Sequence, residues 1–264
     1  DATTLSNKVI KLPDHADILH GQQNYSEGHS AYEWYTYHFA GVDQMTGRSL
    51  YDLDETKESS ASSAGDLVEI NGKKYTMSTS YAKREWAGSA LPSVYGAFGS
   101  NLRWKDLSLN LLFTYSLGGK TYDASYQNLM STASASSASA LHKDVLKSWS
   151  NAPEGMTETS TNRIDPNGIP ILDFNLSDDN NAVSDRWLTS SSYLIMKNIT
   201  LGYNLPKALV SKWGLGGIRV KAGVENLFTI TSRKGLNPQY NFAGGSDDTY
   251  VSARVFNFGL QFDF

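Results

Sequence analysis

Three observations predict that this chain is all-β and forms a segment of a transmembrane antiparallel β-barrel. Residues 254–264 alternate apolar with small or polar side chains without a break, which gives one strand two different faces. No run approaches the roughly eighteen apolar residues that a membrane helix needs. Aromatic residues make up 12% of the chain, and barrels concentrate such residues at both membrane interfaces.

The last strand shows the pattern most clearly. Its apolar face carries Phe256, Phe258, Leu260, Phe262 and Phe264. Its other face carries Asn257, Gly259, Gln261 and Asp263. Large apolar groups on the edge strand of a water-soluble sheet would promote aggregation, whereas a barrel strand needs lipid on one side and a polar lumen on the other.

Further strands are predicted upstream, because the same alternation recurs at 94–104, 107–117, 193–203 and 218–225. Only Lys105 and Asp106 separate the first two, which indicates a tight hairpin turn. Lys197 falls on the apolar side of its strand, so we expect it to snorkel or a β-bulge to shift the register. Two weaker candidates, 3–12 and 31–41, bring the number to about seven strands.

The connections between these strands alternate in length. The long ones cover about 42–92, 118–185 and 231–251. A short one at 205–217 resembles a helical turn opened by Pro206 and closed by Gly214. Within the first long connection, residues 68–75 predict a hairpin around Asn71-Gly72. Barrels keep short turns in the periplasm and long loops outside the cell, so we expect a periplasmic C-terminus and extracellular long loops.

About seven strands do not close a barrel. Single-chain bacterial barrels have even strand numbers from about eight upward, and a partial set would leave unpaired backbone groups in lipid. We therefore expect residues 1–264 to be the C-terminal portion of a larger barrel, whether as a nicked product, a split subunit or part of a longer chain.

A series of short motifs runs through residues 30–264 in order. The longest spans 192–206, and others lie at 37–47, 89–99, 113–119, 142–144, 225–228 and 234–238. In this order and spacing they resemble the C-terminal quarter or so of the SusC/RagA family of TonB-dependent transporters, found in the Bacteroidetes. The family's plug and TonB-contacting segment have no counterpart in these residues.

The resemblance implies a 22-stranded barrel with a plugged lumen in the bacterial outer membrane. It also implies a SusD-like surface lipoprotein that closes over the barrel as a lid, and active import of oligosaccharides or, in some members, peptides. The TonB complex would drive import by pulling on the plug. Because the final strand carries the insertion signal in similar barrels, we expect an assembly signal at Phe258, Leu260, Phe262 and Phe264.

Other classes of function are weighed on the same residues. A passive porin or structural barrel would share the strand pattern but not the motifs, and a soluble β-sandwich carbohydrate-binding module would share the surface aromatics. A net charge of −4 without a basic stripe disfavours nucleic acid as a partner. The chain has no nucleophile motif and no HExxH pair, so we expect neither an enzyme nor a cofactor.

Candidate substrate contacts lie in the long connections. Aromatic rings stack on the apolar faces of sugars and amides bond their hydroxyls, which favours Tyr122, Tyr126, Asn128, Tyr240 and Asn241. The same side chains would suit an interface with a lid protein, where Tyr is enriched.

His142, Val145, Leu146 and Trp149 are spaced to share one face of a short helix. This helix would present Trp149 to a sugar or to the lid, or it would pack the loop onto the barrel rim, which is the interpretation we favour. A group of acids at Asp173, Asp178, Asp179 and Asp185 lacks the spacing of an EF-hand, so a solvated loop is favoured over a calcium site.

Overall fold

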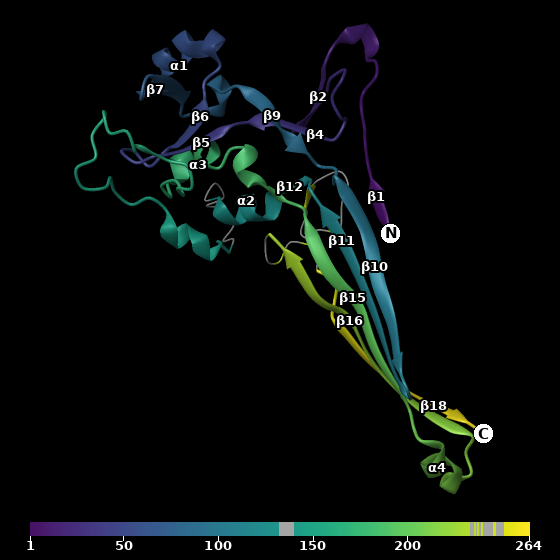
Figure 1. The fold of residues 1–264 in the computed structure, drawn as a ribbon. Helices are drawn as coiled ribbons and strands as arrows, with labels where there is room; N and C mark the ends of the chain where they lie inside the picture. Colours follow the sequence, from purple (N-terminus) through teal and green to yellow (C-terminus); the bar gives the residue numbers. More distant parts are fainter. Residues whose placement is uncertain (132–139, 233–234, 236, 238, 240–244, 247–250) are drawn as a thin grey trace.

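The computed structural model describes residues 1–131, 140–232, 235, 237, 239, 245–246 and 251–264. It consists of a long twisted antiparallel sheet and a loop domain at one end of that sheet (Figure 1). The loop domain comprises residues 18–92, 118–131, 140–190 and 245–246. A short helical turn, residues 205–216, lies at the opposite end.

The long sheet has six strands. In spatial order they are β1 (Ala2–Thr4), β10 (Val94–Trp104), β11 (Leu107–Leu117), β15 (Tyr193–Asn204), β16 (Gly217–Thr231) and β18 (Val255–Asp263). Each pairs antiparallel with its neighbour. The five strands with the clearest alternation are thereby confirmed, and β16 extends well beyond the predicted 218–225.

Both weaker strand predictions need correction. Of the predicted strand 3–12, only residues up to Thr4 pair with β10, and the chain then leaves the sheet, where Val9 donates to the carbonyl of His29 at 2.8 Å. The range 31–41 does not join the long sheet. It contributes instead to two strands of the loop domain, because its apolar residues pack against that domain's core.

Strand pairing sorts the side chains of the long sheet into rows of one character. A row on one face reads Leu102, Leu109, Leu201, Ala222 and Phe258. The adjacent row on the opposite face reads Asn101, Asn110, Thr200, Gly223 and Asn257. The alternation seen along each strand therefore continues across strands as one apolar and one polar face. On the apolar face, Trp104 is 70% exposed and Phe258 83% exposed.

A β-bulge in β15 accounts for Lys197. The register shifts at this residue against both neighbouring strands. Its Nζ atom reaches Oδ1 of Asn226 at 3.3 Å and Oε1 of Gln239 at 2.9 Å. The bulge also turns Ile195 away from the face of Ile199, so the predicted alternation through 193–203 holds only on each side of the bulge.

The end of the long sheet away from the loop domain is closed by short connections. Lys105, with a φ of 53°, forms the two-residue turn between β10 and β11. Pro206 precedes the predicted helical turn, and Gly214 ends it in the left-handed conformation. This turn consists of α4 (Lys207–Val210) and the 3₁₀-helix η7 (Ser211–Trp213).

Three smaller sheets build the loop domain. The first has β2 (Ile18–His20), β3 (Gln23–Tyr25), β4 (Glu33–Tyr37) and β9 (Arg84–Ser89). The second has β13 (Ile164–Asp165), β5 (Phe39–Asp43), β6 (Ser49–Asp52), β8 (Lys73–Thr76) and β7 (Leu67–Ile70). The third joins β14 (Leu188–Ser190) and β12 (Lys120–Asp123) with β17 (Gly245–Ser246). The hairpin predicted around Asn71-Gly72 is confirmed as β7–β8.

Short helices connect many of these strands. They are α1 (Glu58–Ala64), α2 (Ala124–Met130) and α3 (Ser177–Asn180), with the 3₁₀-helices η1 (Pro13–His15), η2 (Glu55–Lys57), η3 (Thr79–Tyr81), η4 (Lys143–Lys147), η5 (Phe174–Leu176) and η6 (Asp185–Trp187). Asp123 caps α2 by accepting from the backbone N–H of Tyr126 at 2.9 Å. None of the described helices is long and apolar enough to cross a membrane.

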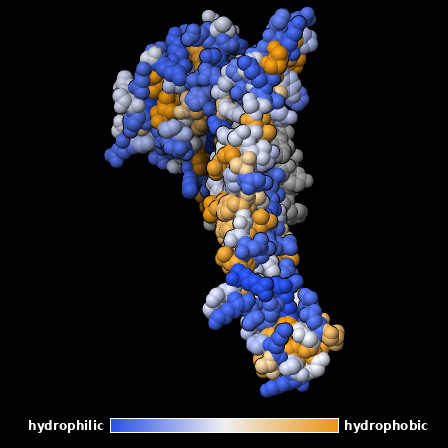
Figure 2. Space-filling model, turned by 45° about the vertical axis from the view of Figure 1, so that its right-hand side comes forward, coloured by the Kyte–Doolittle hydropathy of each residue, from blue (hydrophilic) through white to orange (hydrophobic). Residues whose placement is uncertain are grey.

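The two parts bury apolar side chains differently. The loop domain has its own core, in which Val42, Leu50 and Tyr51 are almost completely shielded from solvent. On the long sheet, hydrophobic residues instead gather at the surface, as the space-filling view shows (Figure 2). The exposed apolar face has no covering layer among the described residues.

Candidate functional site

The loop domain carries the predicted contact residues Tyr122, Tyr126, Asn128 and Trp149, and a buried ion pair helps to hold it together. Arg163 donates from Nε and Nη2 to the two carboxylate oxygens of Asp43 at 2.7 and 2.8 Å. Burial raises the pKa of Asp43, but the hydrogen bonds from Arg163, from the N–H of Met45 and from the Thr46 hydroxyl outweigh it and hold this pKa below its usual value. The pair joins strand β5 to the segment that leads into β13.

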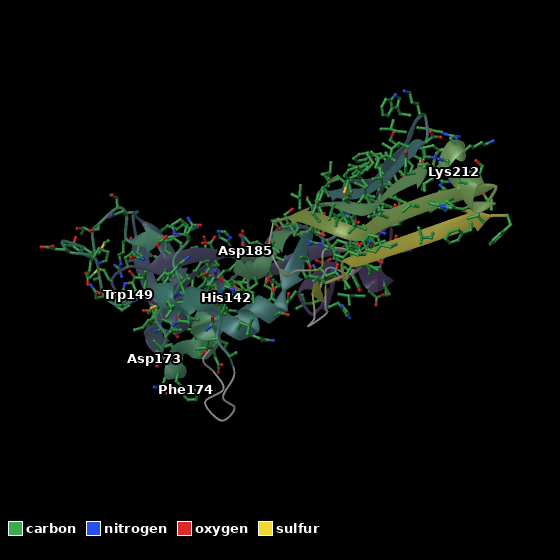
Figure 3. The ribbon with its side chains drawn as sticks, turned by 90° about the horizontal axis from the view of Figure 1, so that it is seen from below. His142, Trp149, Asp173, Phe174, Asp185 and Lys212 are labelled. Atoms are coloured by element: carbon green, nitrogen blue, oxygen red, sulfur yellow. The ribbon has the colours of Figure 1, made fainter. Side chains whose placement is uncertain are left out.

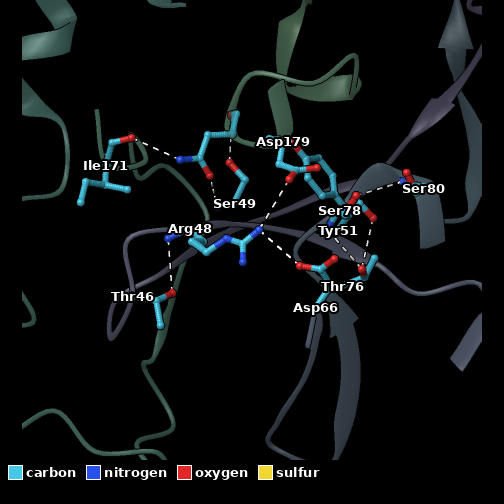
Figure 4. A network of polar contacts seen from close by, with 11 residues as sticks. Thr46, Arg48, Ser49, Tyr51, Asp66, Thr76, Ser78, Ser80, Ile171 and Asp179 are labelled. Carbon is cyan, nitrogen blue, oxygen red and sulfur yellow. Dashed lines mark hydrogen bonds and ion pairs between the residues drawn. The ribbon is translucent and has the colours of Figure 1, made fainter. Parts of the chain in front are cut away.

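A second polar network connects the two long connections 42–92 and 118–185 (Figure 4). The guanidinium of Arg48 lies 3.4 Å from Asp66 and 3.6 Å from Asp179. Ser49 donates from its backbone N–H to the Asn180 side chain at 3.0 Å and from its hydroxyl to the Asn180 carbonyl at 2.9 Å. Segments far apart in sequence therefore form one folded unit rather than independent loops.

Aromatic side chains surround a further arginine in this unit. The guanidinium of Arg186 lies 4.9 Å from the ring centre of Phe39 and 4.6 Å from that of Trp187. Burial lowers the pKa of Arg186, and burial likewise raises the pKa of Tyr51 far above its usual value. The Tyr51 hydroxyl donates to the Asp179 carbonyl at 2.6 Å, which fixes the Tyr51 side chain inside the domain.

Tyr122 and Tyr126 both lie against the core of the loop domain. Tyr122 is 5% exposed, packs near Trp34 and donates from its hydroxyl to Gln127 at 2.6 Å. Tyr126 is partly buried, and its hydroxyl donates to Asp144 at 3.0 Å. That hydrogen bond, ahead of a smaller opposing effect of burial, lowers the pKa of Asp144. Contact of either tyrosine with a substrate or a lid stays a prediction.

Trp149 packs into the loop domain as well. Its indole N–H donates to the Gln44 carbonyl at 2.9 Å, and a Cβ on Gly47 would collide with its ring. The predicted shared helix face is wrong for Leu146, which is 88% exposed while Val145 is 9% exposed. The segment forms the 3₁₀-helix η4, whose three residues per turn place adjacent residues on different faces.

The remaining predicted residues are spread over the molecule. Asn128 is exposed on α2, whereas Tyr240 and Asn241 lie outside the described residues. Figure 3 shows His142, Trp149, Asp173 and Asp185 in the loop domain, with Lys212 at the opposite end of the molecule.

The acidic residues considered for calcium have separate contacts. Asp185 accepts from the Phe39 N–H at 2.8 Å and contacts Nδ1 of His38 at 2.6 Å, so it joins η6 to the start of β5. Asp173 accepts from the N–H of Asn175 at 2.8 Å and caps η5. Among the described residues, His, Cys, Asp and Glu side chains form no group of three or more that could hold a metal ion.

The structure adds an aromatic surface cluster that the sequence had not indicated as a site. His29 stacks on Trp86 with ring centres 3.9 Å apart, and Trp86 lies 4.9 Å from Tyr35. On the same strands, Arg84 lies 4.7 Å above the ring of Tyr37. Tyr35 and Tyr37 alternate with the buried Trp34 and Thr36, and this pattern could have indicated the cluster. On sequence alone, the pattern instead predicted a membrane strand.

Exposed apolar side chains also occur on the loop domain. They include Leu129, Leu141, Leu146, Leu172 and Phe174, each between 37% and 88% exposed. At the other end of the chain, Phe258, Leu260, Phe262 and Phe264 are exposed by 48–99%. The first three extend the apolar face of the long sheet, and their role in assembly stays a prediction.

Comparison with known proteins gives consistent likenesses, although no family model matches the chain. It is 27% identical over 98% of its length to the TonB-dependent receptor P3 of Formosa agariphila. A stretch of 92 residues, 34% of the chain, is 40% identical to the TonB-dependent receptor SusC of Bacteroides thetaiotaomicron. The chain spans 26% of the first of these relatives and 9% of the second.

Solved structures resemble the fold along nearly the whole chain. The RagAB peptide transporter matches with a TM-score of 0.65 and 23% identity, covering 98% of this chain and 25% of that one. The RagAB peptide importer in its closed-closed state gives a TM-score of 0.63. The chain therefore has the fold of one part of the RagAB transporter structures.

Proposed function

The chain resembles SusC/RagA-type TonB-dependent outer-membrane transporters, and from this likeness we propose that it forms the C-terminal barrel segment of an active nutrient importer. The long connections face the outside of the cell and the short turns face the periplasm. The rest of the barrel and the plug complete the wall, and TonB acts through that plug. Its role is transport rather than catalysis.

One observation carries this proposal: the long sheet has a continuous apolar face and a continuous polar face. The rows containing Leu201 and Thr200 match a wall with lipid outside and a hydrated lumen inside. A soluble sandwich module would bury the apolar face instead of leaving Phe258 83% exposed. The loop domain then lies above the membrane, where incoming nutrients arrive.

An oligosaccharide is the substrate class we propose first. The cluster of His29, Trp86 and Tyr35 combines aromatic faces with hydrogen-bonding groups, as sugar recognition requires. Asn128 is exposed on α2 and can bond a hydroxyl. Tyr126 and Trp149 are the other candidate substrate contacts in the loop domain.

Peptides are the second candidate, favoured by the likeness to the RagAB peptide transporter. A surface lipoprotein of the SusD class is the partner we propose in either case. The exposed apolar residues of the loop domain, with Leu146 and Phe174 among them, support such a contact because apolar side chains of this kind gather where proteins associate.

Uptake by intact cells tests the proposal. The complete gene is deleted in the source bacterium and restored on a plasmid, and entry of labelled oligosaccharide and oligopeptide pools is measured with and without a protonophore. We expect uptake of one pool to require the gene and to stop when the protonophore abolishes the energy supply of TonB. Uptake that continues unchanged would indicate a passive porin.

The partner is tested by affinity purification of the full-length protein in mild detergent. We expect a surface lipoprotein to copurify. Replacing Leu146 and Phe174 with Ser should reduce its recovery, whereas Lys57→Gln, on the same domain, serves as the surface control. Equal recovery with all variants would contradict the assignment of the contact to this surface.

A further inference from the structure

The helical turn 205–216, at the end of the long sheet opposite the loop domain, presents an unusual surface. Trp213 is 62% exposed and Leu209 48% exposed, while Val210 between them is fully buried. Lys207 and Lys212 are exposed on the same turn. The turn itself contains no acidic residue, so it combines two exposed apolar groups with two positive charges, and Asp106 and Asp263 belong to the neighbouring segments.

Hydrogen bonds fix this turn close to the end of the apolar face. The N–H of Asn204 donates to the Asp106 carbonyl at 2.9 Å, and that of Gly216 to the Asp263 carbonyl at 2.7 Å. In the adjacent hairpin, Trp104 is 70% exposed, with the ammonium of Lys105 5.2 Å from the centre of its ring. Figure 2 shows hydrophobic residues on the lower part of the sheet and again on this turn.

The depth of the turn in the membrane follows from the short link between β15 and α4. Only Leu205 and Pro206 separate the last residue of β15 from the first residue of α4. Since the headgroup layer of a bilayer is about 5–8 Å thick on each side, a turn that follows the strand so directly lies at headgroup depth. Tryptophan favours this layer, and lysine near it is attracted to phosphate.

We propose that the turn 205–216, with Trp104 and Lys105 beside it, is a binding site for anionic phospholipid headgroups. Leu209 and Trp213 enter the boundary of the acyl chains, and Lys207 and Lys212 contact the phosphate. The occupant is a lipid of the leaflet at this end, because the surface lies beyond the end of the apolar face and its lysines complement a phosphate. The inference rests on the proposed function, which places the sheet in a membrane.

Native mass spectrometry of the full-length protein tests the site. The protein is exchanged into an equal mixture of phosphatidylglycerol and phosphatidylethanolamine, and the retained lipids are counted. We expect the unaltered protein to retain phosphatidylglycerol preferentially and the variant Lys207→Gln/Lys212→Gln to lose about tenfold in that affinity. The control Lys143→Gln/Lys147→Gln removes two exposed lysines from the loop domain and should leave retention unchanged.

A second variant separates the apolar from the charged contribution. Leu209→Ala/Trp213→Ala should lower the retention of both lipids without changing their ratio. Equal retention by the unaltered protein and by the lysine variant, or replacement of lipid by a copurifying protein at this end, would overturn the lipid site alone. Absence of the unaltered protein from the outer-membrane fraction would overturn the proposed function, and the lipid site with it.

Discussion

The long sheet and the loop domain use apolar residues in opposite ways. In the loop domain, Trp187 and Tyr51 are at most 2% exposed, as in a protein folded in water. In the long sheet, Trp104 and Phe258 are at least 70% exposed although both lie in regular strands, each paired there with one neighbouring strand. The two parts of the chain therefore expose large apolar side chains to very different extents.

This difference also separates what stabilises each part. Backbone pairing between neighbouring strands satisfies peptide groups inside the sheet, and in the proposed barrel lipid would cover the apolar face. The loop domain relies on contacts between residues distant in sequence, such as the pair of Asp43 and Arg163, separated by 120 positions. Substitutions should consequently act on assembly in the first part and on folding of the domain in the second.

The largest effect is expected from Asp43→Ala in the loop domain. The change leaves Arg163, which is 8% exposed, without its carboxylate partner. Breaking a buried ion pair costs about 3–5 kcal/mol. Limited proteolysis of the full-length protein should then cleave the loop domain much faster, while the barrel stays intact.

The double variant Asp43→Leu/Arg163→Met is the control, because replacing both partners removes the unpaired charge. We expect it to be more resistant to proteolysis than the single variant.

The same pair predicts that the loop domain becomes less stable in acid. Since the pKa of Asp43 is lowered in the folded state, its contribution is complete above the ordinary value of 3.8 and is lost as the pH falls below it. Cleavage of Asp43→Ala at wild-type rates would contradict the role of the pair.

The two faces of the sheet are compared at adjacent residues of β15. Leu201→Arg places a charge in the apolar row, where an arginine in lipid costs about 2–4 kcal/mol at the membrane midplane and less toward the end of the strand, where Leu201 lies. Thr200→Arg changes the polar row and should cost much less. The measurement is the amount of heat-modifiable barrel in the outer membrane. Equal amounts for the two variants would show that the faces are assigned wrongly.

Sequence alone predicted the sheet better than the domain, and for a physical reason. In 107–117 apolar side chains lie on one face of the sheet and mostly polar ones on the other, so the strand can be recognised from its local alternation. A charge at Lys197 interrupts the alternation of its strand, and a β-bulge was one of the two explanations expected for it. Strand 31–41 was assigned to the wrong sheet because a strand packed on a protein core shows the same alternation in sequence as a strand facing lipid.

The candidate contacts were harder to predict. Tyr122 lies against Trp34, 88 positions away in the sequence, and such packing leaves no local signal. Spacing suggested one helix face for Val145 and Leu146, but the segment adopts a 3₁₀-helix and separates them. Tyr122, Tyr126 and Trp149 all lie in the loop domain, and their burial depends on contacts that only the fold reveals.

A smaller effect is expected at two glycines of the loop domain that both have left-handed backbones. Gly47 has a φ of 73° and faces the Trp149 ring, whereas Gly65 has a φ of 78° and open space around it. Gly65→Ala should cost about 1 kcal/mol from the backbone alone. Gly47→Ala adds the collision and should cost about 2–3 kcal/mol. If Gly47→Ala and Gly65→Ala were cleaved at equal rates, the Trp149 ring would move aside without loss of stability.

The smallest effect is expected where an ion pair lies at the surface of the same domain. Lys74 contacts Glu58 at 2.6 Å, a shorter distance than any in the pair of Asp43 and Arg163, yet both its side chains are at least 40% exposed. Water and salt screen such a pair, so Lys74→Ala should change the stability of the domain by less than about 1 kcal/mol. If proteolysis of this variant matched that of Asp43→Ala, the distance between charges and not their burial would decide the strength of ion pairs in the loop domain.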